Sequence, residues 1–235
     1  MNFGISIDKV YQKVLAIANK EQRGYITPQE FNLFANQAQM DIFEQYFYDL
    51  NQFRRLSGND TEYADMVDII EKKIAIFENS TYSNISNGAV TFPTLHKLGS
   101  LFFINGSDYV EVERVSNKEL HLINSTPLTA PSAARPIYVQ TSATTAQMYP
   151  KSTSTNVTVN YIAKPATVKW TYVVINNKAI HNSGAADLQN FELHASEENE
   201  LVIKILNLAG IAIKDYALAQ AAGNKEINTV SQEKQ

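Results

Sequence analysis

The spacing of hydrophobic and polar residues changes twice along the chain. Up to about residue 79, apolar residues recur at helical intervals. From 80 to 185, Gly, Pro, Asn, Ser and Thr interrupt the chain every few residues, and short alternating runs predict strands. Helical spacing returns from 187 to 222. The pattern predicts an α+β fold in which N- and C-terminal helices form a helical bundle with an inserted small antiparallel β domain.

These changes also set the domain boundaries that we expect. Residues 1–80 form the N-terminal helical part, 81–186 the β domain, and 187–223 the C-terminal helices that rejoin the bundle. Residues 224–235 are polar and have little to bury, so we expect a flexible tail that orders only on a partner.

The second helix is the most informative element, and it is predicted from Pro28 to Leu50. Thr27 is a suitable N-cap, Pro28 suits the first helical position, and Glu30 completes a capping box. The helix carries aromatic residues on several faces, and such a helix must be covered from more than one side. We expect neighbouring subunits of an assembly to supply part of that cover.

Two further helices have clear sequence signals. A third helix follows the loop at 57–60, with one apolar stripe. The C-terminal helix is predicted to start at Ser196 as its N-cap and to end near Gly210. Asp215 is expected to cap a short last helix that Gly223 closes.

The middle of the chain contains strand and turn signals. Asn87-Gly88 and Asn105-Gly106 are strong hairpin signals, and Asn176-Asn177 predicts another turn. The strand candidates are 101–104, 109–115, 120–123, 136–140, 156–162 and 170–175, and a Pro-rich loop is expected over 126–136.

The segment from Asn19 to Glu30 is also superficially similar to a calcium-binding loop. Gly24 falls on the invariant glycine and Glu30 on the last ligand position, but Arg23 occupies a position that needs an oxygen ligand. The capping box explains Glu30 better. A calcium-regulated helix–loop–helix module is kept as an alternative.

The bulk composition excludes several classes of protein. The chain of 235 residues has no cysteine, so disulfides and zinc–sulfur sites are excluded. Its net charge of −4 gives no global attraction to nucleic acid. No apolar run approaches the roughly 18 residues of a membrane span, and no export signal is recognised, so we expect a soluble intracellular product without membrane contact.

The sequence offers no catalytic motif. The four histidines are scattered, and the HASEE stretch starting at His194 lacks the second histidine of an inverted zincin site. Neither a nucleophile elbow nor a nucleotide fingerprint occurs. We therefore predict no catalytic, cofactor-binding or metal-binding residues and no enzyme activity. Carboxylates for glycoside chemistry that lie far apart in sequence stay open.

Two local features have competing interpretations. Arg54 and Arg55 lie at a helix end, where they are better explained as caps of carbonyl groups than as a contact to DNA. Trp170 is better explained as a core residue than as a ligand platform. If Trp170 and Tyr172 did form a platform, the chain would be a glycan-binding protein that uses its β domain.

Three blocks of sequence together resemble a known family. They are residues 19–39 (NKEQRGYITPQEFNLFANQAQ, followed by IFEQYF at 42–47), 148–170 (MYPKSTSTNVTVNYIAKPATVKW) and 191–215 (FELHASEENELVIKILNLAGIAIKD). This pattern resembles head–tail connector (ring or adaptor) proteins of tailed bacteriophages, most closely those of crAss-like phages that infect Bacteroidetes. The layout is more distantly similar to the tail tubular adaptor of short-tailed podoviruses.

The resemblance implies a structural virion protein without enzymatic activity or cofactors. Its subunits, about twelve per ring, would join portal to tail around the DNA channel. The implied partners are further copies of the chain, the portal protein, other ring or tail proteins, and non-specifically the packaged DNA. The protein would be made in the bacterial host cytoplasm and end in the neck of the virion. Our candidate interface residues are Phe31, Phe43, Tyr46, Phe47, Arg54, Arg55 and Trp170.

Overall fold

The computed structural model divides the chain into two compact units. It describes residues 4–20, 26–55, 61–105, 108–151 and 156–212, together with positions 220, 224, 225 and 228. The first unit contains Met1–Ile76 and Pro165–Gln235, and the second contains Phe77–Lys164. We refer to them as the helical unit and the sheet unit.

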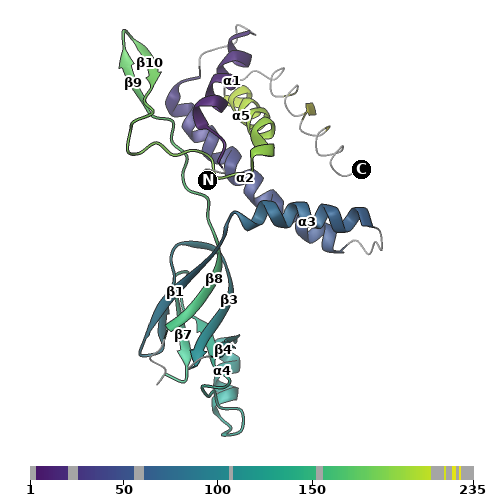
Figure 1. Cartoon of the computed structure of the whole chain (residues 1–235), viewed down its shortest axis with the longest axis vertical. Helices are drawn as coiled ribbons and strands as arrows, with labels where there is room; N and C mark the ends of the chain where they lie inside the picture. The colour runs from purple at the N-terminus through teal and green to yellow at the C-terminus, as the bar shows by residue number, and fades with distance from the viewer. Residues whose placement is uncertain are drawn as a thin grey trace. The chain divides into compact units, whose positions relative to one another are not determined.

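The helical unit is built on one long helix against which the other segments pack (Figure 1). Its elements are α1 (Ile7–Lys20), α2 (Pro28–Arg55), α3 (Thr61–Ala75), β9 (Tyr172–Ile175), β10 (Lys178–His181), the 3-10 turn η1 (Ala195–Glu197) and α5 (Glu198–Ala212). Contacts within this unit join α2 to α3, α2 to α5, and α1 to α5.

The start of α2 confirms the predicted capping box. The Thr27 amide donates to Glu30 Oε2 at 2.9 Å, and the Glu30 amide donates to Thr27 Oγ1 at 3.3 Å. Hydrogen bonds from the Thr27 side chain and backbone lower the pKa of the Glu30 carboxyl. Glu30 is thus engaged as a helix cap, while residues 21–25 of the calcium-like segment lie outside the described part.

The chain itself covers α2 on several faces. The Tyr11 ring from α1 lies 4.6 Å from the Phe31 ring and 4.2 Å from that of Trp170, measured between centroids. The buried side chains of α2 are Phe31, Ala35, Ala38, Gln39, Ile42, Phe43 and Tyr46. Three of the seven aromatic residues of α2, Phe31, Phe43 and Tyr46, are therefore enclosed within the helical unit, whereas Tyr48 is 67% exposed.

Amide side chains bind an extended segment to α2. Asn36 accepts from the Val168 amide and donates to the Val168 carbonyl, both at 2.9 Å. Asn32 makes the same pair of bonds to Trp170, at 2.8 and 3.2 Å. Gln39 donates to the Ala166 carbonyl at 2.9 Å. Residues four apart on a helix and residues two apart on an extended chain are both separated by about 6–7 Å. This equal spacing lets Asn32 and Asn36 bond to alternate residues of the extended segment.

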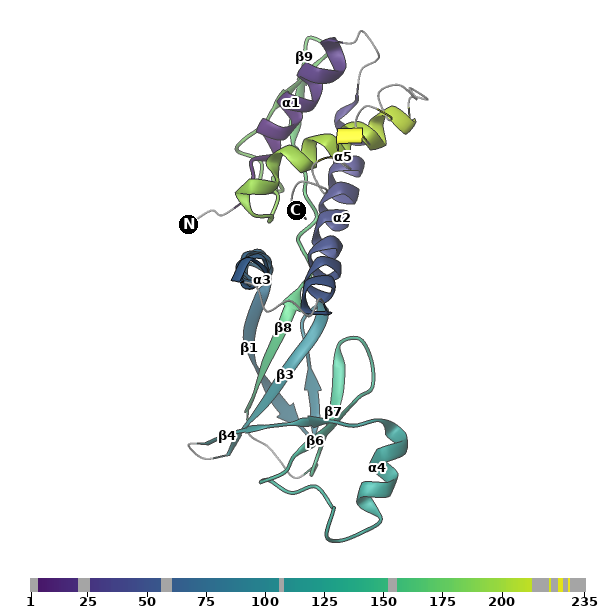
Figure 2. The ribbon, with the colours of Figure 1, turned by 90° about the vertical axis from the view of Figure 1, so that its right-hand side faces the viewer.

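The sheet unit contains, among its described residues, eight strands and one helix (Figure 2). The elements are β1 (Glu78–Ser86), β2 (Ala89–Thr91), β3 (Leu95–Asn105), β4 (Asp108–Glu111), β5 (Glu113–Arg114), α4 (Asn117–Asn124), β6 (Ile137–Gln140), β7 (Thr145–Tyr149) and β8 (Asn156–Ala163). The strand order is β4-β3-β8-β1-β2-β7-β6-β5, and all pairs are antiparallel except β5 with β6.

This sheet curls until its two ends meet. The strands at the ends of the order, β4 and β5, follow each other in the chain with only Val112 between them. The Val112 amide donates to the Leu101 carbonyl at 2.8 Å, while β5 pairs with β6. One core lies inside, with buried side chains from β1, β2, β3, β6, β7 and β8. The sheet unit is therefore nearly a closed barrel.

The predicted fold class, a helical bundle with a small inserted antiparallel β domain, is wrong. The structure has a large mixed sheet that is nearly barrel-shaped, with a core of its own. Strands β1 and β7 were not predicted, because polar residues (Ser, Thr and Asn in β1, Thr and Gln in β7) weaken their alternation of apolar residues. The hairpin of β9 and β10, which the sequence placed in the β domain, belongs to the helical unit.

Three local predictions also need correction. The strand candidate 120–123 is part of helix α4, whose N-cap Ser116 forms a capping box with Glu119. The N-cap is His194 at the start of the 3-10 turn η1, which leads into α5, and its side chain accepts from the Ser196 amide. Gly210 does not end α5, which continues to Ala212. Asp215 and Gly223 lie outside the described residues.

Candidate interaction surfaces

The described residues contain no constellation that binds a metal. No group of three or more His, Asp or Glu side chains is placed to hold an ion within them. The described helices also include none with the length and apolar character that crossing a bilayer requires. The features that stand out are two surfaces of the helical unit.

The first surface is one face of the β9–β10 hairpin. Val173 lies opposite Ile180, and Ile175 opposite Lys178, in the antiparallel register. Because side chains alternate along a strand, these four residues share one face, which we call the hairpin face. Val173, Ile175 and Ile180 are 44%, 52% and 47% exposed, so three β-branched aliphatic side chains meet solvent together.

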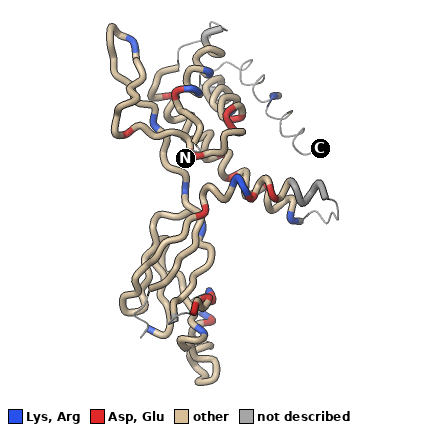
Figure 3. The backbone as a smooth tube through the Cα atoms, in the orientation of Figure 1, with Lys and Arg blue, Asp and Glu red and all other residues tan. Residues whose placement is uncertain are grey.

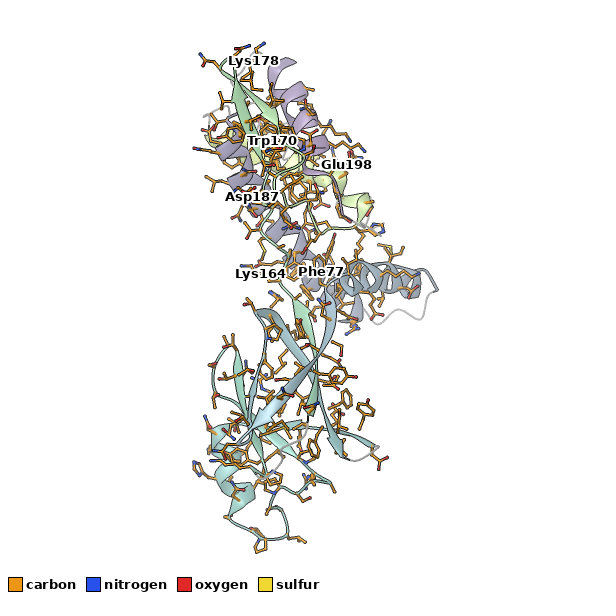
Figure 4. All side chains as sticks on the ribbon, turned by 60° about the vertical axis from the view of Figure 1, so that its left-hand side comes forward. Phe77, Lys164, Trp170, Lys178, Asp187 and Glu198 are labelled. Carbon is orange, nitrogen blue, oxygen red and sulfur yellow. The ribbon has the colours of Figure 1, made fainter. Side chains whose placement is uncertain are left out.

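The opposite face of the hairpin is held by Trp170 at its base, whereas Val174, nearer the turn on that face, is 64% exposed. The rings of Tyr172 and His181 stack on the Trp170 ring, at centroid distances of 5.7 and 5.6 Å. Trp170 is 1% exposed, and its Nε1 donates to Asp8 Oδ1 at 2.9 Å. Figure 4 shows Trp170 among packed side chains and Lys178 at the far end of the hairpin. The base of the hairpin is therefore fixed to the core of the helical unit.

The tip of the hairpin is a tight turn. Asn176 and Asn177 have φ values of 50° and 59°, the left-handed conformation that two-residue hairpin turns require. The two strands form a sheet of their own, without a third strand among the described residues. An isolated two-stranded ribbon with an apolar exposed face is marginally stable in water. Such a ribbon gains stability when a partner covers it.

The second surface is an apolar groove of about 650 Å³ between α2, α3 and the start of α5, which we call the α2–α3 groove. Its apolar lining comes from Ile42, Phe53, Met66, Ile69 and Ile70, and its charged lining from Asp49, Lys72, Lys73, Glu197 and Glu200. Ile69 is 47% exposed at its edge. Figure 1 shows α3 running beside the C-terminal half of α2.

A buried ion pair lies in the wall of this groove. Lys73 Nζ is 2.7 Å from Glu197 Oε1, and the Glu197 side chain is 4% exposed. Burial alone would raise the pKa of Glu197, but its contacts with Lys73, together with hydrogen bonds to Glu200 and Ser196, lower it on balance. Glu197 thus stays ionised and ties α3 to the turn before α5.

The sequence-predicted interface residues fall into three groups. Phe31, Phe43, Tyr46 and Trp170 are buried within the helical unit. Phe47 is half-buried with its ring 5.1 Å from that of Phe43. Arg54 is exposed and pairs with Glu71 at 2.5 Å, and the side chain of Arg55 lies outside the described part. The structure does not bring the six of these residues whose side chains it describes together into one surface.

Sequence reasoning missed the hairpin face, and of the α2–α3 groove it named only Tyr46, which is part of the lining. Val173 to Ile175 reads as a buried strand, because a run of β-branched residues beside a turn usually enters a sheet. Its side chains are nevertheless exposed, because the hairpin forms a separate two-stranded sheet outside the larger sheet and its core. The α2–α3 groove depends on how three helices pack, which spacing within one helix does not encode.

The two units differ in charge. Residues 77–164 carry six basic and five acidic residues, whereas the rest of the chain carries fourteen and nineteen. Figure 3 shows the charged positions concentrated in the helical unit, with few on the strands. The surface of the sheet unit is therefore polar mainly through amides and hydroxyls, which lose less on desolvation than charges do.

Comparison with known proteins gives no family assignment. No family model matches the chain, and no curated protein matches it significantly.

Proposed function

We propose that this protein is a structural subunit of a phage head–tail connector, forming a ring that joins portal to tail around the DNA channel. The observation that carries the proposal is the hairpin face, three aliphatic side chains exposed together on a ribbon anchored by Trp170. Exposed apolar clusters on a fixed support are typical of protein–protein contacts.

Two further features support an assembly rather than a catalyst. The three sequence blocks resemble connector proteins. The weakly charged surface of the sheet unit suits extensive contact with other proteins, since it has few charges to desolvate. The partners in this proposal are further copies of the chain, the portal and other tail proteins.

The alternative functions have less support. The glycan-binding alternative needs an accessible Trp170, but this ring is buried and stacked. The calcium alternative needs the carboxylate of Glu30 as a ligand, and that group caps α2. We therefore retain the connector role as the proposal.

Quantitative mass spectrometry of purified phage particles tests this role. The particles are those encoded by the genome that contains this sequence, and portal peptides provide the internal standard. We expect about as many copies of this chain as of the portal protein, of the order of twelve per particle for a closed ring. Particles that are complete and infectious but lack the chain would refute the proposal.

A further inference from the structure

We propose that the hairpin face of one subunit docks in the α2–α3 groove of the next copy of this chain. This inference rests on the proposed ring function and identifies the contact that builds the ring. It makes the hairpin a connecting element between subunits rather than a local feature of one subunit.

The placement of the two surfaces within the helical unit favours a head-to-tail contact. The base of the hairpin is bound to α2 near Asn32, whereas the groove is lined by α2 from Ile42 to Phe53. Tyr46 lies in the middle of that lining, and about 21 Å along the helix separates it from Asn32. Two unlike surfaces at opposite ends of one helix are what a ring of repeated heterologous contacts requires.

The apolar chemistry of the two surfaces matches. The hairpin face offers Val173, Ile175 and Ile180, all exposed. The groove offers an apolar lining that includes Phe53, Met66 and Ile69 in about 650 Å³. That volume lies within the range of pockets that take a group of this size. Docking would bury apolar side chains on both partners.

The charges of the two surfaces are also complementary. Lys178 lies on the hairpin face beside the turn, and residues 168–186 contain two lysines and no carboxylate. The groove lining has three carboxylates, on Asp49, Glu197 and Glu200, and two ammonium groups, on Lys72 and Lys73. Glu197 and Glu200 already face Lys73 and Lys204, at 2.7 and 3.7 Å. The other carboxylate of the lining, which a lysine entering with the apolar face would approach, is that of Asp49.

The same charges argue against a symmetric contact. If two hairpin faces packed on each other, two Lys178 side chains would join one apolar patch with no carboxylate from residues 168–186 to compensate them. Like charges across a ribbon contact are destabilising. The groove of a second copy is therefore the better receptor for the hairpin face.

Disulfide trapping tests the contact cleanly because the chain has no native cysteine. One preparation of the full chain carries Ile175→Cys and a second carries Ile69→Cys, both at exposed positions. The two are mixed, oxidised and separated without reductant. We expect a disulfide-linked dimer in the mixture and none above background in either preparation alone.

A matched control uses Leu128→Cys, which is 92% exposed in the sheet unit. Mixed with Ile175→Cys, it sets the background from random collision. Adding Lys178→Glu to the Ile175→Cys chain should slow trapping several-fold at low salt, with a smaller effect at high salt, because salt screens exposed charges. Circular dichroism verifies that each variant is folded.

Two results would overturn the hairpin–groove contact. One is a dimer from Ile175→Cys alone, which would indicate a symmetric hairpin contact. The other is a mixture that yields no more dimer than the Leu128→Cys control. If rings are nonetheless seen by mass measurement of the wild-type chain, or the chain is found in particles, the ring proposal stands and only this contact is wrong.

Discussion

At the scale of single residues, polar side chains help to hold the helical unit together alongside its aromatic core. Asn32, Asn36 and Gln39 satisfy backbone groups of an extended segment that has no strand partner at those positions. A buried backbone group without a partner costs free energy, so these amides have a structural role that composition alone does not reveal.

Replacing Asn36 should therefore destabilise the protein. In Asn36→Ala, both the amide and the carbonyl of Val168 lose their partner. We expect the free energy of unfolding to fall by about 2 kcal/mol, measured by urea denaturation. Gln37→Ala is the control on the same helix, because the exposed Gln37 side chain bonds only to the side chain of Asp41. Equal losses in the two variants would contradict this role.

The Lys73–Glu197 pair gives a prediction about pH. The pKa of Glu197 is lower in the folded protein than its ordinary value of 4.5. The ion pair therefore contributes to the stability of the fold above that pH. It is lost as the pH falls through the lowered pKa. Lys73→Met leaves a carboxylate buried without its cation, and we expect a loss of about 3 kcal/mol at pH 7.

The free energies of unfolding of Lys73→Met and of the wild type should then converge as the pH falls. In Lys73→Met the pKa of Glu197 rises, so the carboxyl becomes neutral at higher pH and the deficit shrinks between pH 7 and 4. Urea denaturation curves recorded across that pH range measure the difference in free energy of unfolding between the two proteins. Lys72→Met, which breaks an exposed pair with Asp68, should cost less than about 0.5 kcal/mol. A deficit that does not vary with pH would contradict the assignment.

At the scale of elements, the β9–β10 hairpin depends on its turn. Asn177 has a φ of 59°, which a β-branched residue adopts only with strain. Asn177→Val should open the hairpin more often, raising hydrogen exchange of amides 172–181 about tenfold. Exchange in α2 should stay unchanged. If the hairpin exchanged as slowly as in the wild type, the turn would not be its stabilising feature.

The elements also show what could be predicted from sequence. The start of α2 and the turn at Asn87-Gly88 follow from local chemistry, and the structure contains both. The short apolar run 120–123 suits either a helix or a strand, and the nearby Ser116 and Glu119 capping box, readable in the sequence, decides for the helix.

The interacting surfaces could not be predicted in the same way. Phe31, Phe43 and Trp170 were candidate contacts because aromatic residues lie at many interfaces. They are buried because segments far apart in sequence wrap α2, which no local pattern encodes. The closure of the sheet through residues 108–114 likewise depends on pairing between distant strands.

At the scale of the whole molecule, the sheet unit is one continuous segment with its own core. A fragment of residues 77–164 should therefore fold alone, since domains with their own core do so. Dispersed amide signals in a nuclear magnetic resonance spectrum and cooperative melting would support this. A fragment with the spectrum of an unfolded chain would show that the sheet needs the helical unit.

The most direct test of the connector role is an electron cryomicroscopy reconstruction of the neck of the phage particle encoded with this chain. We expect a closed ring between portal and tail, in which the helical unit and the sheet unit each fit the density of every subunit, with a hairpin of one subunit against α2 and α3 of the next. A neck whose rings are all accounted for by other chains, with this one missing, would contradict the role.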